Sequence, residues 1–163
     1  MYLYIARHAW AGDYGDPCWP DDSLRELTPE GAERFMHVVQ ALAARGFEPQ
    51  RIATSPYTRC RQTADIIARY VDGQPPIDEL EALEPGSDVD ELVEWTNEHA
   101  GRDVCWVGHN PDIQHLAGAL VGVGGANIRF AKGAVAAIRF DDAGAILGSG
   151  ELYWLATAKS LGL

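Results

Sequence analysis

The chain has 163 residues, of which 47% are hydrophobic and 23% charged, and these proportions predict one globular domain over residues 1–163 with a single buried core. Its formal net charge of −11 argues against a nucleic-acid or anionic-membrane partner, because most of the surface would repel such polyanions. A phosphate site in this protein would therefore have to be a local cluster of positive charge.

The first half of the chain is predicted to alternate strands with helices. Residues 2–6 form a continuous apolar and aromatic run, typical of a strand that is buried on both faces. After a long polar loop, the sequence Thr-Pro-Glu opens a predicted helix over residues 28–45, because threonine can cap free amides and proline suits the first helical position. Residues 51–54 then predict a second strand, and residues 57–70 a second helix.

The second half continues with shorter elements that are separated by glycine and proline. We expect strands near Ile77 and at 103–107, 134–140 and 149–155, and helices at 89–99 and 111–121. A glycine-containing loop is expected at 122–125, and a hairpin turn at 141–144. Because the early strands alternate with helices, this order predicts an α/β fold: an open, mostly parallel sheet flanked by helices on both faces, with an antiparallel C-terminal strand.

The cysteines and the N-terminal residues bear on redox state and location. Cys18, Cys60 and Cys105 are odd in number and lack paired spacing, so we expect reduced thiols rather than a disulfide framework or a zinc site. The first residues show no basic leader, and no stretch approaches the roughly 20 apolar residues of a membrane helix. We therefore expect a soluble, cytoplasmic protein that does not associate with membranes.

Arginine and histidine side chains follow three of the predicted strands. Arg7 and His8 end the first strand, Ser55 and Arg59 follow the second, and His109 follows the fourth. In an open α/β sheet, ligands bind outside the carboxyl ends of the strands, where such loops come together. We therefore expect two arginines and two histidines to converge on one site.

These side chains suit the transfer of a phosphoryl group. The planar, permanently charged guanidinium groups of Arg7 and Arg59 match phosphate oxygens and can neutralise a dianion. A neutral histidine such as His8 can attack phosphorus, which splits one difficult displacement into two. His109, protonated near the bound phosphate, would donate to its equatorial oxygens. Ser55 is a further candidate for binding phosphate, although its more ordinary role is to shape the turn before the following proline.

Four motifs resemble those of the histidine phosphatase superfamily and occur in the family's order. They are Arg7-His8, residues 27–31 (Leu-Thr-Pro-Glu-Gly), Ser55-Pro56 followed by residues 59–64, and residues 107–111 (Val-Gly-His-Asn-Pro). The resemblance implies a phosphoglycerate mutase-like fold in which His8 becomes phosphorylated while the two arginines and His109 hold the phosphoryl group. It also selects Arg59 over Arg61, which lies on a different side of the predicted helix.

The short chain and the single helix between the third and fourth strands are similar to the phosphohistidine phosphatase branch of this family, which lacks the helical insertions of larger members. That branch removes phosphate from histidines of phosphorelay or phosphocarrier proteins. The resemblance therefore implies a phosphohistidine-bearing protein as the substrate. The acidity of the chain suggests that this partner docks through a neutral or basic surface around its phosphohistidine.

The chain departs from the family pattern at two places. Ala9 stands where the family usually has glycine, and replacing glycine by alanine is the smallest possible change of side chain. Larger members place a catalytic acid after the third strand in a Leu-x-Glu context, whereas residues 80–85 (Leu-Glu-Ala-Leu-Glu-Pro) leave a non-acid at the expected position. Glu81 or Glu84 could substitute as the acid. A phosphohistidine nitrogen leaves more easily than an alkoxide, so the departure favours a phosphoramidate substrate.

Three other functions compete with this interpretation. A phosphomonoesterase for a small phosphorylated metabolite would use the same residues but would need a better acid. A noncatalytic phosphate-binding module would keep the pocket without turnover, and the presence of both His8 and His109 argues against it. A metal hydrolase is disfavoured because the sequence has no HxxxH, HxxEH or clustered cysteine spacing, so we expect no metal ion or other cofactor.

Overall fold

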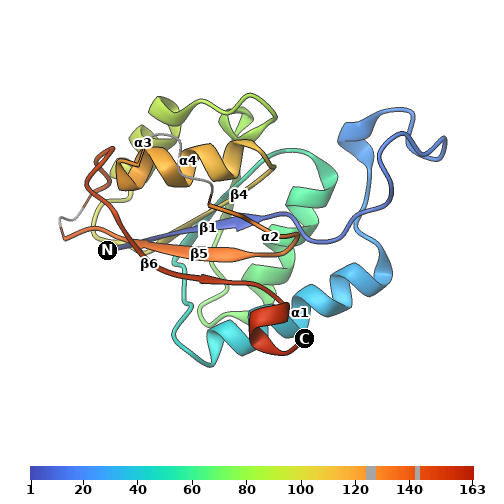
Figure 1. Ribbon diagram of the computed structural model, residues 1–163, viewed down its shortest axis with the longest axis horizontal. Helices are drawn as coiled ribbons and strands as arrows, with labels where there is room; N and C mark the ends of the chain where they lie inside the picture. Colours follow the sequence, from blue (N-terminus) through green and yellow to red (C-terminus); the bar gives the residue numbers. More distant parts are fainter. Residues whose placement is uncertain (124–127, 142–143) are drawn as a thin grey trace.

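The computed structural model describes residues 1–123, 128–141 and 144–163, and the strands within these ranges form one sheet (Figure 1). Their bounds are Tyr2–Arg7 for β1, Arg51–Thr54 for β2, Ile77–Glu79 for β3, Val104–Gly108 for β4, Val135–Arg139 for β5 and Glu151–Ala156 for β6. The sheet order is β3-β2-β4-β1-β5-β6. The first four strands run parallel, β5 pairs antiparallel with β1, and β6 pairs antiparallel with β5. The predicted open, mostly parallel sheet is confirmed, and its direction first reverses at β5.

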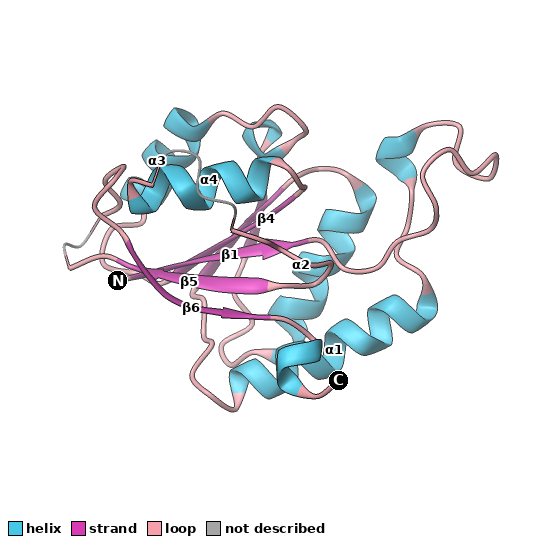
Figure 2. Ribbon diagram, in the orientation of Figure 1, coloured by secondary structure: helices cyan, strands magenta, loops and turns pink. Residues whose placement is uncertain are grey.

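Four α-helices in the described part of the chain cover the two faces of the sheet. Their bounds are Pro29–Ala43 for α1, Thr58–Tyr70 for α2, Val89–Glu98 for α3 and Asp112–Val121 for α4. Helices α1 and α2 pack on one face, and α3 and α4 pack on the other (Figures 1 and 2). The predicted cover on both faces is confirmed.

The central strand β1 explains why its apolar run lacks alternation. Leu3 and Ile5 pack in the hydrophobic core that α3 and α4 cover, whereas Tyr4 and Ala6 pack in the core that α1 and α2 cover. All four side chains are buried. Because successive side chains of a strand point to opposite faces, a continuous apolar run is stable only where both faces are covered, as they are here.

The start of α1 is fixed by the cap that its sequence predicts. The Oγ1 atom of Thr28 accepts a hydrogen bond from the amide of Gly31 at 3.0 Å, and Pro29 is the first helical residue. Gly31 also contacts the loop after β1, because a Cβ atom at this position would clash with the carbonyl oxygen of Trp10. The same oxygen accepts from the amide of Thr28 at 3.0 Å. The first turn of α1 therefore packs directly on that loop.

Some sequence expectations concern segments that the structure describes only in part. The loop predicted at 122–125 is described to residue 123, and the hairpin turn predicted at 141–144 lacks its two central residues. Within the described ranges, no helix is both long and apolar enough to cross a membrane. Cys18, Cys60 and Cys105 are free thiols, of which only Cys18 is exposed.

Candidate active site

His8 and His109 lie side by side at the carboxyl edge of the sheet. They follow β1 and β4, which are parallel neighbours with Arg7 opposite Gly108 in the register. The amide of His8 continues this pairing by donating to the carbonyl of Gly108 at 3.0 Å. The centroids of the two imidazole rings are 5.5 Å apart. The expected convergence of these two histidines is therefore seen in the structure.

The hydrogen bonding of His8 leaves one ring nitrogen available for attack. Its Nδ1 atom lies 2.8 Å from the carbonyl oxygen of Ala9, and a carbonyl can only accept, so we assign the ring proton to Nδ1. Nε2 then carries the free lone pair. Burial lowers the pKa of His8 to about 3, and the positive charges of Arg59 and Arg7 act in the same direction. The ring is therefore neutral at physiological pH, as a nucleophile must be.

His109 is held in the complementary tautomer. Arg59 can only donate, so its Nη2 atom donates to Nδ1 of His109 at 3.2 Å. The proton on Nε2 then points to the Oγ atom of Ser55, 3.0 Å away. Burial, followed by the charge of Arg59, lowers the pKa of His109 to about 3, so the ring is neutral in the ligand-free protein. A phosphoryl dianion nearby would raise this pKa towards the protonated state that the sequence interpretation assumes.

Two arginines supply the positive charge of the site. Arg7 donates from Nη1 to the carbonyl of Phe130 at 2.9 Å. Arg59, only 4% exposed, donates from Nη1 to the carbonyl of Asp22 at 2.7 Å. The Nε atoms of both arginines are buried and have no hydrogen-bond partner among the described residues. Such donors are costly when unpaired, and an anion with several acceptor oxygens is the kind of ligand that satisfies them.

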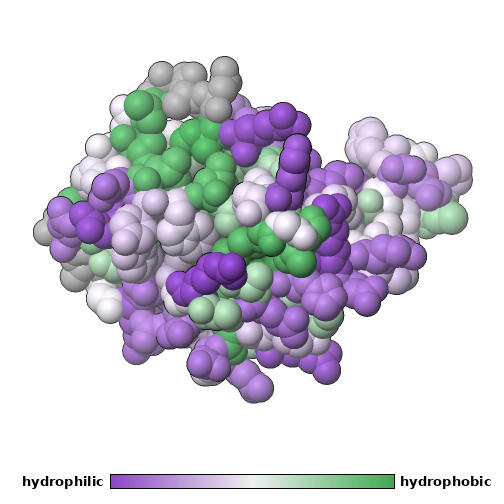
Figure 3. Space-filling view, turned by 60° about the horizontal axis from the view of Figure 1, so that its bottom comes forward, coloured by the Kyte–Doolittle hydropathy of each residue, from purple (hydrophilic) through white to green (hydrophobic). Residues whose placement is uncertain are grey.

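Asp22 is a site residue that sequence reasoning missed. It lies in the short 3-10 helix η1 (Asp22–Leu24), within a loop that projects from the body in Figure 1 and has a mostly hydrophilic to neutral surface in Figure 3. Its carboxylate accepts from Arg59 at 3.0 Å and from Arg25 at 2.8 Å. Partial burial opposes ionisation, but these two arginines hold the pKa of Asp22 below its usual value. Asp22 therefore remains a carboxylate.

Among the described residues, the two candidate acids form no hydrogen bond or ion pair with the site. Glu81 belongs to the short 3-10 helix η2 (Glu81–Leu83) and is exposed, while Glu84 directly follows it and is partly exposed. Within the described ranges, neither carboxylate forms a hydrogen bond or ion pair with the histidines or arginines of the site. Ala82 and Leu83 point into the core instead. Hydrogen bonds thus join Arg59 and Ser55 to His109, whereas Glu81 and Glu84 stay candidate acids without such a bond.

Ala9 fits where the family usually has glycine. Its side chain is fully buried in the core beneath α1 and α2, and its amide donates to Oγ1 of Thr63 at 3.1 Å. Thr63 in turn donates to the carbonyl of Arg59 at 2.6 Å. The methyl group of Ala9 therefore lies in apolar packing, and its amide links the nucleophile loop to the helix that carries Arg59.

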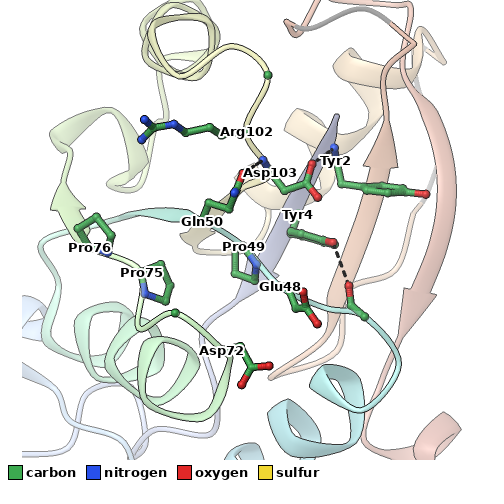
Figure 4. A pocket seen from close by; sticks show the side chains of 13 residues that line it. Tyr2, Tyr4, Glu48, Pro49, Gln50, Asp72, Pro75, Pro76, Arg102 and Asp103 are labelled. Atoms are coloured by element: carbon green, nitrogen blue, oxygen red, sulfur yellow. Dashed lines mark hydrogen bonds between the residues drawn. The ribbon is translucent and has the colours of Figure 1, made fainter.

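A cavity of about 780 Å³ lies at the opposite, amino edge of the strands, away from the two histidines (Figure 4). Tyr2 and Tyr4 at the start of β1 form part of its lining, and the hydroxyl of Tyr4 donates to the carbonyl of Gly46 at 3.4 Å. The Oδ1 atom of Asp103 accepts from the amide of Tyr2 at 2.6 Å. None of the residues predicted to handle phosphate lines this cavity.

The chain is similar to known proteins over most of its length. The sequence profile of the histidine phosphatase superfamily (branch 1) matches residues 3–84. An uncharacterized protein of Picosynechococcus sp. is 33% identical over 143 residues, which cover 85% of each chain. The solved structure of the protein histidine phosphatase SixA complexed with tungstate matches with a TM-score of 0.83 and 25% identity over 99% of both chains. The alpha-ribazole phosphatase from Shigella flexneri shares the fold, with a TM-score of 0.67 and 16% identity over 90% of this chain and 94% of that one. The chain therefore belongs to the histidine phosphatase superfamily.

Proposed function

We propose that this chain, a phosphatase by its family, hydrolyses phosphohistidine in a protein through a covalent intermediate on His8. The observation that carries the proposal is the state of the His8 ring. The carbonyl of Ala9 holds the proton on Nδ1, and burial keeps the ring neutral, so Nε2 is available as a nucleophile. The buried Nε atoms of Arg7 and Arg59 have no hydrogen-bond partner among the described residues and can donate to the oxygens of the phosphoryl group.

In the first half-reaction, the lone pair of His8 Nε2 attacks phosphorus, and the bond between phosphorus and the substrate nitrogen breaks. The leaving imidazole nitrogen accepts a proton from solvent as the bond breaks, because a nitrogen bound to phosphorus is more basic than the bridging oxygen of an ester. The His8 ring gains positive charge as it forms the new bond, and this charge strengthens the hydrogen bond from Nδ1 to the carbonyl of Ala9. The two arginines donate to the phosphoryl oxygens throughout, and the Nε2 proton of His109 turns from Ser55 to the same oxygens.

In the second half-reaction, water attacks phosphorus, the bond to Nε2 breaks, and inorganic phosphate leaves. The proton released by the water passes to phosphate or solvent. His8 returns to its neutral form with Nδ1 still bound to Ala9. The cycle needs no group other than this site and water.

The lack of a suitable acid supports a phosphoramidate substrate. Glu81 and Glu84 form no bond with the site residues, and Asp22 is held as a carboxylate by Arg59 and Arg25. An ester would require a proton donor for its alkoxide, whereas a phosphorylated imidazole does not depend on one. The similarity to SixA, a protein histidine phosphatase, favours the same substrate class. We further propose a cytoplasmic location, to which the three free thiols are suited.

The test compares a phosphohistidine peptide with an alkyl phosphomonoester such as glycerol 3-phosphate, whose leaving group is an alkoxide, as substrates of the purified protein. We expect kcat/KM to be at least about 100-fold higher for the peptide, because the site lacks the general acid that an ester requires. A preference for the ester would instead support the metabolite phosphatase. Phosphate binding without turnover of either substrate would support the noncatalytic module.

Metal chelation is expected to leave turnover unchanged. The nucleophile and the charged groups of the proposed mechanism are all protein side chains. Activity on the phosphohistidine peptide should therefore be the same before and after incubation with EDTA. Loss of activity that added Mg²⁺ or Zn²⁺ restores would contradict the mechanism.

Asp22→Asn is expected to lower the inhibition constant of inorganic phosphate roughly three- to tenfold, because the carboxylate competes with the product dianion for the charge of Arg59. The constant can be measured from competitive inhibition of peptide hydrolysis. Asp21→Asn is the matched control, since the Asp21 side chain accepts from Ser23 instead. A higher constant in Asp22→Asn would show that this carboxylate mainly holds Arg59 in position for phosphate.

A further inference from the structure

A second cavity, of about 370 Å³, gathers positive charge beside the active site. Its lining consists of Trp10, Arg34, Arg129, Ala131, Lys132, Thr157, Ala158 and Lys159. These include four of the protein's 13 basic residues, among them its only two lysines, and no acidic residue. In a chain of net charge −11, this cavity is a local centre of positive charge.

The basic side chains reach the cavity from three separate segments. Arg34 comes from α1, Arg129 and Lys132 precede β5, and Lys159 belongs to the short 3-10 helix η3 (Lys159–Leu161). All four are exposed. Arg34 is held over the indole ring of Trp10, 4.5 Å from its centroid, and donates to the main-chain oxygen of Leu163 at 2.8 Å. Among the described residues, the other three form no ion pair with an acid.

The cavity and the active site share two pieces of main chain. Trp10, which lines the cavity, lies two residues after His8. The carbonyl of Phe130, between two lining residues, accepts from Nη1 of Arg7 at 2.9 Å. The amide of Gly133, next to Lys132, donates to the carbonyl of His8 at 3.1 Å. A substrate segment bound at His8 therefore has the cavity as its immediate neighbour.

We propose that this cavity binds acidic side chains that flank the phosphohistidine of the protein substrate. The inference rests on the proposed function and deepens it by naming what the partner presents beside its phosphorylated residue. Guanidinium and ammonium groups are the natural partners of carboxylates, and the volume of the cavity suits a few side chains. The net charge favours a short acidic segment over an extended polyanion, because the rest of the surface would repel the latter.

The loop before α1 carries mostly the other sign of charge. The loop before α1 contains Asp13, Asp16, Asp21 and Glu26, and it also carries Asp22, which contacts Arg59. An acidic segment of the substrate would be repelled by this loop and attracted at the cavity. These local charges lead us to propose an acidic segment beside the phosphohistidine, whereas the net charge of the whole chain favours a neutral or basic partner surface.

The experiment uses two phosphohistidine peptides that differ only in three aspartates or three asparagines beside the phosphohistidine. Both are assayed with the wild-type protein, with Lys132→Gln/Lys159→Gln, and with Arg102→Gln/Arg139→Gln as a charge-matched control. Arg102 and Arg139 are exposed and lie at the opposite edge of the sheet. Phosphoramidate ion, which is too small to reach the cavity from His8, reports the catalytic step alone.

We expect the kcat/KM of wild type to be roughly tenfold higher for the aspartate peptide than for the asparagine peptide, which is the effect that two partly exposed ion pairs would give. The difference should lie in KM and should become smaller at high salt. Lys132→Gln/Lys159→Gln should lose this preference while its turnover of phosphoramidate stays unchanged, and the control should keep both. Wild type without the preference, or a preference that survives in the lysine variant, would overturn this inference and leave the proposed function standing. Failure of wild type to hydrolyse either peptide would overturn the proposed function itself.

Discussion

His8→Ala is expected to reduce hydrolysis of a phosphohistidine peptide by at least about 10⁴-fold, because the substitution removes the atom that forms the covalent intermediate. In the wild-type protein, rapid mixing with labelled substrate followed by alkaline quench should trap an acid-labile phosphoenzyme. The variant should show no such label. Single-turnover measurements would locate the loss in the chemical step rather than in product release.

Two controls separate this loss from unfolding or misassignment. His115→Ala removes an exposed histidine of α4 and should leave both turnover and label unchanged. Binding of tungstate to His8→Ala, measured by calorimetry, would show that the arginines of the site are still in place. Label that persists in His8→Ala but disappears in His109→Ala would reverse the roles of the two histidines.

The stability of the protein should fall steeply between pH 7.5 and pH 5. The two buried histidines have pKa values of about 3 in the folded protein, whereas their ordinary value is 6.5. Between these values the unfolded chain binds more protons than the folded chain, so acid favours unfolding. Each histidine then contributes about 2 kcal/mol less to the free energy of unfolding at pH 5 than at neutral pH. Urea unfolding at the two pH values, followed by tryptophan fluorescence, measures the difference.

Substitution of one histidine measures how much that histidine contributes to the loss of stability at pH 5. His8→Gln should retain only about half of the difference between pH 7.5 and pH 5, since one titrating group is gone. His115→Gln, at an exposed position, should retain all of it. Asp22 and Asp78, whose pKa values are lowered by arginine partners, lose their contribution only at more acidic pH and so do not confound the comparison. Equal stability at both pH values in the wild-type protein would contradict the neutral, buried state of the two rings.

The sequence predicted the parts of the site that depend on local pattern. A fully apolar run predicted a strand with two buried faces, and β1 has them. The cap at Thr28 predicted the start of α1. Parallel strands place their carboxyl ends at one edge, so the positions of His8 and His109 after β1 and β4 were enough to predict their approach.

The parts that the sequence did not predict depend on the paths of loops. Asp22 meets Arg59 across 37 residues, through a loop whose only local signal is the spacing of Asp22 and Arg25 by three positions. The basic cavity likewise combines three segments whose proximity no periodicity encodes. Glu81 and Glu84 flank two apolar residues that are buried in the core, and a role for either as the acid stays a prediction.

The contact between Gly31 and Trp10 ties the nucleophile to the folding of α1. The carbonyl of Trp10 has room only because residue 31 has no side chain, and it accepts from the amide of Thr28 at the helix cap. Since His8 lies two residues before Trp10, we expect the loop that carries it to reach its final course only when α1 has docked. We therefore expect catalytic competence to depend on this docking, so that recovery of activity after dilution from denaturant would report when α1 docks.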